Sequence, residues 1–542
     1  MLFDEANEVF EIFKGSLPFY VILFLPILII VSPLNPVDGA HEFTVYRMQQ
    51  YDLQGNNRGC RSSVVNVEAR TVNGGVLARR CVIARLLDLN PFKYKDVINQ
   101  GAGAILILVP DNLTSLSMEN RQHVAELENA MLTEETQIPV YFVTETKDLL
   151  NIYQSIHVAS IEDQTISASQ AIMSAVMSTG FQMVTSGAQS KPISNCNVAS
   201  IQGKLSGFGV EDQLPTIALV AHYDSFGVAP GLSVGADSNG SGVAALLELA
   251  RLFSRLYANP KTQPKFNILF LLSGGGKFEG GLLQDSVYTL CLDTVGSGDN
   301  LYLHVSKPPK EGSAGAIVLR ELKMVTNRFY PDAKFDMVHK KINLAEDTLA
   351  WEHERFSIRR LPAFTVSGLS SPREQQRNSI LDTRDQVDVD VLYRNVKLIA
   401  EALARCIYNI TQPEIEVFTE SLAVQKDRLA AWMDYLTATP RAAQMLVEPS
   451  KSQLILDLQH ELSRFISDVR LSVAKPEKRD PEFTFYDAIS TTMTAYSVKP
   501  AVFDLVLMIA VAVYLCALYF IIQAFPKFYW MVAQMGVKMK QT

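Results

Sequence analysis

The sequence predicts an α/β protein with one helix long enough to cross a membrane, and three observations support this fold class. Residues 215–292 alternate between apolar runs of strand length, polar loops and one long helix, which is typical of a sheet covered by helices. The helix expected over residues 243–257 has its apolar residues on one face. Residues 505–522 are apolar and carry no charge, as in a membrane-spanning helix.

Length and composition limit the class of protein. The chain has 542 residues, of which 48% are hydrophobic and 20% are charged, so it can form two or three globular units with a sizeable core. Its formal net charge is -8, and basic residues occur only in short runs such as Arg79 and Arg80. We therefore expect no nucleic acid among its partners.

The strand expected over residues 215–222 ends on a polar side chain. PTIALVAH is an almost unbroken apolar run, as in a strand buried on both faces, and His222 is its last residue. Ligands of open α/β sheets bind at the carboxyl ends of the strands. Gly240 and Gly242 allow a tight turn just before the helix that follows. The sequence therefore predicts a site next to His222.

Two sequence blocks at this site carry a family resemblance. HYD (222–224) and GADSNGSG (235–242), followed by a long helix, resemble the pattern of the M28 family of zinc aminopeptidases. The resemblance extends over residues 214–408. It implies an M28-like α/β central domain, and it implies which positions would bind a pair of metal ions.

The resemblance places some metal-binding positions on suitable residues and others on unsuitable ones. His222 and Asp293 match two ligand positions, and Asp224 matches the carboxylate that accompanies the first histidine. The aspartate that bridges the two metals falls on Ser238, while Asp237 lies one position too early. A neutral hydroxyl lacks the negative charge that would hold two cations together.

The proton-transfer residue and the last ligand are also replaced. The family's pair of glutamates falls on Gly276 and Lys277, or one position earlier, and the last histidine falls on Asn378, whose amide is a poor zinc ligand. Two of the five ligand positions therefore keep a suitable residue. Zinc sites use three or four well-placed ligands, and a proton-transfer group alone contributes about a hundred- to ten-thousand-fold in rate. We therefore expect a catalytically degenerate domain without metal or other cofactor.

Two alternatives to a non-catalytic scaffold remain. A zinc-dependent aminopeptidase would contain stoichiometric zinc and would lose activity in a chelator. A substrate-docking module, as in the related nicastrin, would bind a free amino terminus without cutting it. The retained His222, Asp224 and Asp293 fit docking as well as they fit structural inheritance.

Longer segments across the chain resemble the nicalin family of nicastrin-like membrane proteins. They include HEFTVYRMQQYDLQG, AHYDSFGVAP, INLAEDTLAWEHERF and KRDPEFTFYD, although the segment after Lys277 is shorter than the family pattern. The resemblance implies a subunit of the BOS complex in the endoplasmic reticulum membrane. The implied partners are Nodal modulator, a small multi-pass membrane protein of the transmembrane protein 147 type, and the ribosome-bound translocon. The implied role is support of multi-pass membrane protein biogenesis, with an influence on Nodal signalling.

We expect six parts along the chain. Residues 1–40 contain an apolar run and read as a secretory signal or, because acidic residues precede that run, as an uncleaved anchor. The other parts, in order, are an N-terminal lumenal α/β lobe (41–203), a degenerate M28-like domain (204–410), a helical lumenal extension and connector (411–499), a transmembrane helix (500–525) and a cytosolic tail (526–542).

Charges next to the membrane helix predict its orientation. Lys527, Lys538 and Lys540 follow the apolar run, so the positive-inside rule places the tail in the cytosol and most of the chain in the lumen. Asp504 precedes the run and is expected at the membrane interface. These features predict a single-pass type I protein.

A lumenal location makes three glycosylation sequons relevant. Asn112, Asn239 and Asn409 each fit the acceptor pattern, and a glycan on Asn239 would lie in the former active-site loop. The cysteines are too few and too scattered for a disulfide scaffold, but one or two bonds are compatible with the sequence.

Two other motifs receive structural interpretations. Ser233 in GLSVG matches the nucleophile elbow of serine hydrolases, but it follows a loop where that motif requires a strand, so we interpret it as a turn residue. Residues 352–354, with the sequence EHE, have the composition of a metal motif, and we expect a solvated loop there.

Overall fold

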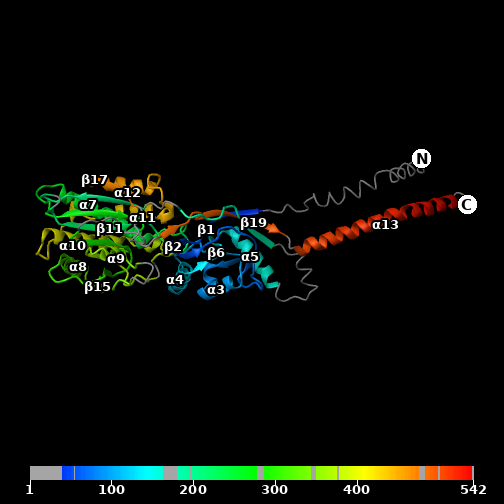
Figure 1. The fold of residues 1–542 in the computed structure, drawn as a ribbon, viewed down its shortest axis with the longest axis horizontal. Helices are drawn as coiled ribbons and strands as arrows, with labels where there is room; N and C mark the ends of the chain where they lie inside the picture. Colours follow the sequence, from blue (N-terminus) through cyan, green and yellow to red (C-terminus); the bar gives the residue numbers. More distant parts are fainter. Residues whose placement is uncertain are drawn as a thin grey trace.

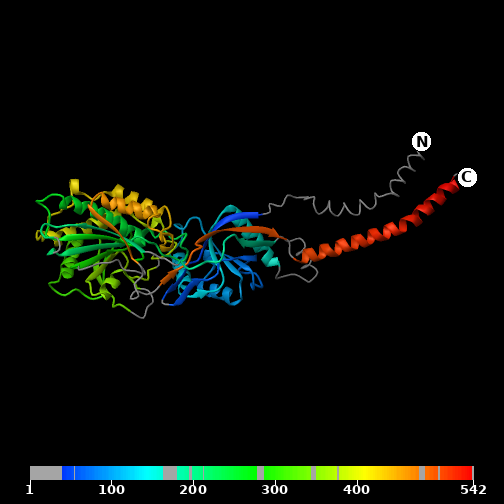
Figure 2. The same ribbon diagram turned by 45° about the horizontal axis from the view of Figure 1, so that its top comes forward.

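The computed structural model describes residues 40–53, 55–162, 180–193, 198–210, 213–276, 286–343, 349–374, 377–474, 483–498 and 501–539. Figures 1 and 2 show an elongated molecule in which two lobes and one long helix follow each other along the long axis. We call the lobe next to the helix the barrel lobe and the other the central lobe. The helix is α13 (Ala501–Met539).

The barrel lobe is a closed barrel with helices packed around it. Its strands follow the order β1-β19-β9-β4-β5-β6-β8, and β8 pairs back with β1. The strands are β1 (Ala40–Arg47), β4 (Asn66–Thr71), β5 (Cys81–Arg85), β6 (Ala104–Val109), β8 (Val140–Thr144), β9 (Gly180–Thr185) and β19 (Ser490–Val498). The helices are α3 (Pro91–Asn99), α4 (Met118–Thr133) and α5 (Lys147–Glu162).

Local sequence explains why these elements form. β6 has the sequence AILILV, and all of its side chains are buried, as expected for a strand covered on both faces. α3 begins after Asn90, whose side chain accepts a hydrogen bond from the amide of Lys93. α4 begins after Ser117, which caps the helix in the same way.

A small sheet lies between the barrel and the central lobe. Its order is β18-β2-β3-β7, and the strands are β2 (Gln50–Leu53), β3 (Asn56–Cys60), β7 (Glu135–Thr136) and β18 (Phe483–Phe485). Tyr51, Leu53 and Phe485 form a buried cluster, and Phe226 of the central lobe packs against it. The two lobes therefore share apolar contacts.

The central lobe is built on one large mixed sheet with the order β15-β14-β16-β13-β11-β12-β10-β17, whose central strands are parallel. Its strands are β10 (Val198–Leu205), β11 (Thr216–His222), β12 (Asn267–Ser273), β13 (Tyr288–Leu292), β14 (Leu301–Val305), β15 (Phe335–His339), β16 (Ala363–Ser367) and β17 (Asp468–Ala474). Its helices are α7 (Gly242–Tyr257), α8 (Ala314–Phe329), α9 (His353–Ile358), α10 (Val389–Tyr408), α11 (Lys426–Thr437) and α12 (Gln453–Ser463).

The strand and helix expected around His222 are confirmed. β11 ends at His222 and pairs in parallel with β12 and β13, so it lies in the middle of the sheet. α7 follows it and is buried along almost its whole length. The predicted α/β fold class is therefore confirmed, with the largest buried cluster formed by this sheet and the helices beside it.

The helical extension expected over residues 411–499 is only partly helical. α11 and α12 lie there, but β17 adds to the large sheet, β18 adds to the small sheet and β19 enters the barrel. The residues after α12 do not continue the helix, because Val469 and Leu471 belong to a strand paired with β10. Likewise, β10 belongs to the central sheet, so the large sheet already begins at Val198, before the boundary expected at residue 203.

α13 is longer than a membrane span requires. It continues through Pro526 to Met539, so residues 526–539 extend the helix where a separate tail was expected. Within the described part of the chain, residues Leu507–Met531 form one candidate membrane span by length and composition. Asp504 is exposed in the first turn of this helix. The expected signal or anchor over residues 1–40 lies outside the described residues except for Ala40.

Candidate functional site

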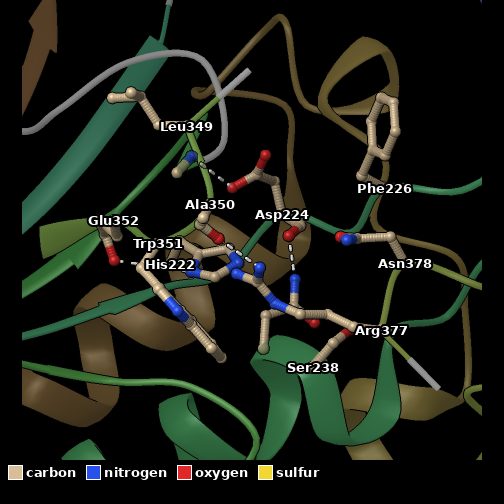
Figure 3. Close-up of a pocket in the computed structure, with 12 residues that line it drawn as sticks. His222, Asp224, Phe226, Ser238, Leu349, Ala350, Trp351, Glu352, Arg377 and Asn378 are labelled. Atoms are coloured by element: carbon tan, nitrogen blue, oxygen red, sulfur yellow. Dashed lines mark hydrogen bonds and ion pairs between the residues drawn. The ribbon is translucent and has the colours of Figure 1, made fainter. Parts of the chain in front are cut away.

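The candidate site is a pocket at the carboxyl ends of the central strands (Figure 3). It is lined by His222, Asp224, Phe226, Ser238, Asn239, Gly276, Leu349, Ala350, Trp351, Glu352, Arg377 and Asn378. The cavity left between these residues has a volume of about 10 Å³, about the least that one water molecule requires.

His222 faces a carboxylate that comes from a distant part of the chain. Its Nδ1 lies 3.6 Å from Oε2 of Glu352, whose carboxylate also accepts a hydrogen bond from the Ser273 hydroxyl. Burial acts to lower the pKa of His222, but the carboxylates of Glu352, Asp293 and Asp224 outweigh it and raise the pKa overall. The carboxylates around His222 therefore stabilise its imidazolium form.

Asp224 is held by the backbone opposite His222. The amide of Gly276 donates a hydrogen bond to its Oδ1 at 3.1 Å. Burial raises the pKa of Asp224, although His222 and this amide act in the opposite direction. A Cβ atom at position 276 would lie 2.1 Å from Cβ of His222. A side chain at position 276, one of the positions expected to match the family's pair of glutamates, would therefore clash with His222 in this conformation.

Arg377 brings a positive charge into the pocket. Its Nη2 donates to Oδ2 of Asp293 at 2.6 Å, and its Nη1 donates to the carbonyl oxygen of Ala350. Its guanidinium carbon lies 4.2 Å from the ring centre of Trp351. In Figure 3 the Arg377 side chain crosses the pocket toward Ala350. Arg377 thus forms an ion pair with Asp293, the residue that matches the second retained ligand position.

The turn that contains Ser238 is fixed by carboxylates outside the pocket lining. This π-helical turn, η3 (Ala236–Ser241), presents the amides of Asp237 and Ser238 to the buried carboxylate of Asp382, at 2.8 and 2.9 Å. Asp237 instead accepts hydrogen bonds from the Gly296 amide, at 2.7 Å, and from the Ser297 hydroxyl. Burial and the charge of Asp382 raise the pKa of Asp237 to about 7. Asp237 therefore does not substitute for the missing bridging aspartate.

A buried arginine, Arg441, holds the loop that follows β11. Arg441 donates to the carbonyl oxygens of Tyr223, at 2.7 Å, and of Val234 and Gly235, both at 2.8 Å. Burial lowers the pKa of Arg441 to about 10, so the side chain is still charged at neutral pH. Three carbonyl contacts on one guanidinium fix the strand end and the following loop in one conformation.

These residues do not fit the zinc pair of M28 enzymes. The bridging position is the hydroxyl of Ser238, the last ligand position is the amide of Asn378, and Asp293 is bound to Arg377. Among the residues that the structure describes, no group of three or more His, Cys, Asp or Glu is arranged to hold a metal ion. We therefore derive no metal-assisted step at this pocket.

The structure brings most of the predicted site residues together. His222, Asp224, Ser238, Gly276 and Asn378 all line the pocket. Asp293 reaches its edge through Arg377, as described above. Lys277, the other degenerate position, lies outside the described residues, as does the shortened segment that follows it.

Sequence reasoning missed two residues that define the pocket, Glu352 and Arg377. The solvated loop expected over residues 352–354 is wrong, because Glu352, His353 and Glu354 are 5%, 1% and 3% exposed. His353 shares a hydrogen bond of 2.8 Å with the Thr365 hydroxyl, and burial lowers its pKa to about 3. Trp351, directly before this run, was the sequence signal for burial.

Other predicted positions have ordinary structural roles or exposed surroundings. Ser233 is buried and donates to the carbonyl oxygen of Ala229 at 2.8 Å, as expected for a turn residue. Asn112 and Asn409 are exposed. Asn239 is 2% exposed, and its amide donates to the carbonyl oxygen of Asp224, so a glycan there conflicts with this conformation. The described cysteines, Cys60, Cys81, Cys291, Cys406 and Cys516, are free thiols, and Cys196 lies outside the described residues.

Comparison with known proteins finds relatives over almost the whole chain. The model of Peptidase family M28 matches residues 199–401. BOS complex subunit ncln of Danio rerio is 51% identical over 565 residues, covering 97% of this chain and 98% of that protein. Nicalin of Caenorhabditis elegans is 31% identical, covering 95% of this chain and 96% of that protein.

A solved structure agrees with the fold. The crystal structure of the gamma-secretase component nicastrin superimposes with a TM-score of 0.56 and covers 84% of this chain and 99% of that chain. At 11% sequence identity this similarity supports a common fold and no more. The identity to relatives over both lobes and the C-terminal helix goes further: the chain belongs to the nicalin family, which includes proteins named BOS complex subunit.

Proposed function

We propose that the chain is a non-catalytic scaffold subunit of a BOS complex. The observation that carries this proposal is the 51% identity, over 97% of the chain, to a protein named as a subunit of that complex. The identity is not confined to the M28-like segment, which ends at residue 401. Identity beyond the M28-like segment favours a function that involves the whole chain.

The pocket supports the absence of catalysis. Position 276, which falls within the expected glutamate pair in either alignment, has no room for a side chain, and Arg377 neutralises the carboxylate of Asp293, a retained ligand position. A peptidase would require both groups, because the proton-transfer residue and the metal act on the same bond. The alternative of a zinc aminopeptidase therefore receives no support from these contacts.

Substrate docking also receives little support. The space left between the pocket residues is small, about 10 Å³. Asp224, which could bind an amino group, already accepts the Gly276 amide, and His222 faces Glu352. We infer that these residues are retained for the structure of the pocket.

We place the chain in the endoplasmic reticulum membrane, with both lobes in the lumen. The span within α13 and the lysines that follow it support this orientation. The partners that we propose are Nodal modulator, a multi-pass protein of the transmembrane protein 147 type and the ribosome-bound translocon. In this setting the complex supports biogenesis of multi-pass membrane proteins and influences Nodal signalling.

Native affinity purification of the full-length protein in mild detergent tests the proposal. Mass spectrometry of the co-purified proteins and metal analysis are carried out on the same sample. We expect membrane-insertion components and translocon subunits without stoichiometric zinc. A solitary protein that carries one or two zinc ions per chain would contradict the proposal and favour the peptidase.

A further inference from the structure

A single arginine makes several contacts at the buried edge of the pocket. The ion pair of Arg377 with Asp293 is 2.6 Å long, and the two side chains are 8% and 2% exposed. The same guanidinium reaches the carbonyl oxygen of Ala350 and the ring of Trp351. Hydrogen bonds to a carboxylate and stacking on an aromatic face are the interactions that a planar guanidinium makes best.

Each of the three carboxylates around the pocket has a partner within the protein. Asp293 is paired with Arg377, and Glu352 lies 3.6 Å from His222. The remaining carboxylate, Asp224, accepts the amide of Gly276. A buried ionised carboxylate without a partner is strongly unfavourable, so each of these pairings is needed where it occurs.

The segment that begins with Arg377 also reaches the barrel lobe. Residues 377–382 form this segment, which we call the lock segment. The amide of Ile380 donates to Oε1 of Glu128 on α4 at 2.9 Å, and the side chains of Ile380 and Leu381 are buried in the cluster inside the barrel lobe. At its far end, Asp382 accepts the amides of Asp237 and Ser238.

We propose that Arg377 is a built-in structural cation, which anchors the lock segment to the sheet and fixes the pocket against the barrel lobe without a metal ion. The disagreement between the pocket and the metal pair of M28 enzymes then has a physical cause. A guanidinium covalently attached to the chain supplies the positive charge that Asp293 requires. The proposal goes beyond membership of a complex, because it concerns what holds the two lobes together.

Thermal unfolding of the full-length protein in detergent tests the ion pair. The variants are Arg377→Met, Asp293→Asn and the double variant. Each single variant leaves a buried charge or dipole unpaired, so we expect Tm to fall by about 5 °C or more. The double variant should lose less than the sum of the two single losses, because it removes both charges together. Losses that simply add would overturn the proposal.

Two controls make this measurement specific. Arg384 and Asp434 form an ion pair of the same length, 2.6 Å, but with side chains that are 29% and 67% exposed. Arg384→Met and Asp434→Asn should each change Tm by about 1 °C or less. A chelator should leave the wild-type Tm unchanged. A fall in chelator would overturn the proposal, since a metal ion would then hold the pocket.

Hydrogen exchange tests the connection to the barrel lobe. If Arg377 anchors the lock segment, the Ile380 amide should exchange faster in Arg377→Met than in the wild type under conditions where both are folded. An unchanged Ile380 amide in a destabilised variant would contradict the anchoring role. These results do not depend on complex membership, because the isolated chain is used, so failure of this proposal is distinguishable from failure of the proposed function.

Discussion

Two strands from the same C-terminal stretch contribute very differently to the fold. β17 lies at the edge of the large sheet and pairs only with β10 among the described strands, and its Val473 is 51% exposed. β19 pairs with β1 on one side and β9 on the other, and its Met493 is fully buried. An edge strand extends a sheet that already exists, whereas a closing strand completes a barrel. The barrel lobe therefore depends on the end of the chain more than the central lobe does.

The largest loss of stability should come from placing a charge on β19, the strand that closes the barrel. Met493→Asp places a carboxylate in the core of the barrel, where Met493 lies among apolar side chains, and we expect a loss of roughly 4 kcal/mol or more in the free energy of unfolding. Limited proteolysis and thermal unfolding would detect the opened barrel. Val473→Asp is the matched control on the edge strand and should change the free energy by less than about 1 kcal/mol. Equal losses in the two variants would remove the distinction between the strands.

An intermediate effect should appear where the barrel lobe contacts the central lobe. Burial raises the pKa of Glu128 to about 7, against 4.5 for an ordinary glutamate. The folded state therefore binds this proton more tightly than the unfolded state. The stability that comes from this tighter proton binding at Glu128 is fully present below pH 4.5 and is lost as the pH rises through 7. The total loss in the free energy of unfolding is on the order of 3 kcal/mol.

Glu128→Gln should remove that pH dependence, because the amide oxygen can still accept the Ile380 amide while the side chain no longer titrates. The measurement is the free energy of unfolding in denaturant at several pH values between 4.5 and 7.5. Glu126→Gln, at an exposed position on the same helix, is the control and should keep the wild-type slope. The same slope in Glu128→Gln would show that another group is responsible.

The smallest loss of stability should come from removing an exposed ion pair on the edge strand, β17. Arg470 and Asp468 on β17 form an ion pair of 2.9 Å, with side chains that are 69% and 53% exposed. Solvent and salt screen such a pair, so Arg470→Ala should cost about 0.5 kcal/mol or less. Denaturant unfolding at low and high salt measures it. A loss above about 1 kcal/mol would mean that the edge of the sheet is less exposed than its side chains indicate.

The sequence was most informative where local pattern and tertiary environment agree. β11, α7 and the positions of His222 and Asn378 followed from a buried strand, an amphipathic helix and the spacing of a family pattern. Each of these signals lies within a short window. The carboxyl end of a central strand then determines where the pocket must be.

The missed features depend on partners far away in the chain. Residues of β19 such as Thr491 and Thr494 are compatible with a strand, but the pairing partners that fix this strand lie about 450 and about 300 residues earlier. Glu352 is buried because Ser273 and His222 face it, and neither contact is visible in the local sequence of charged residues. Tertiary contacts determine both the pairing of β19 and the burial of Glu352.

The position of β19 near the end of the chain also determines when the barrel can close during synthesis. β9 ends at Thr185 and β19 begins at Ser490, so about 300 residues must be added before the barrel can close. At typical elongation rates this takes roughly 15 to 60 s. During that time β1 and β9 expose edges that only β19 covers. The nascent chain must therefore be protected from wrong strand pairing until the last residues before the membrane helix have emerged.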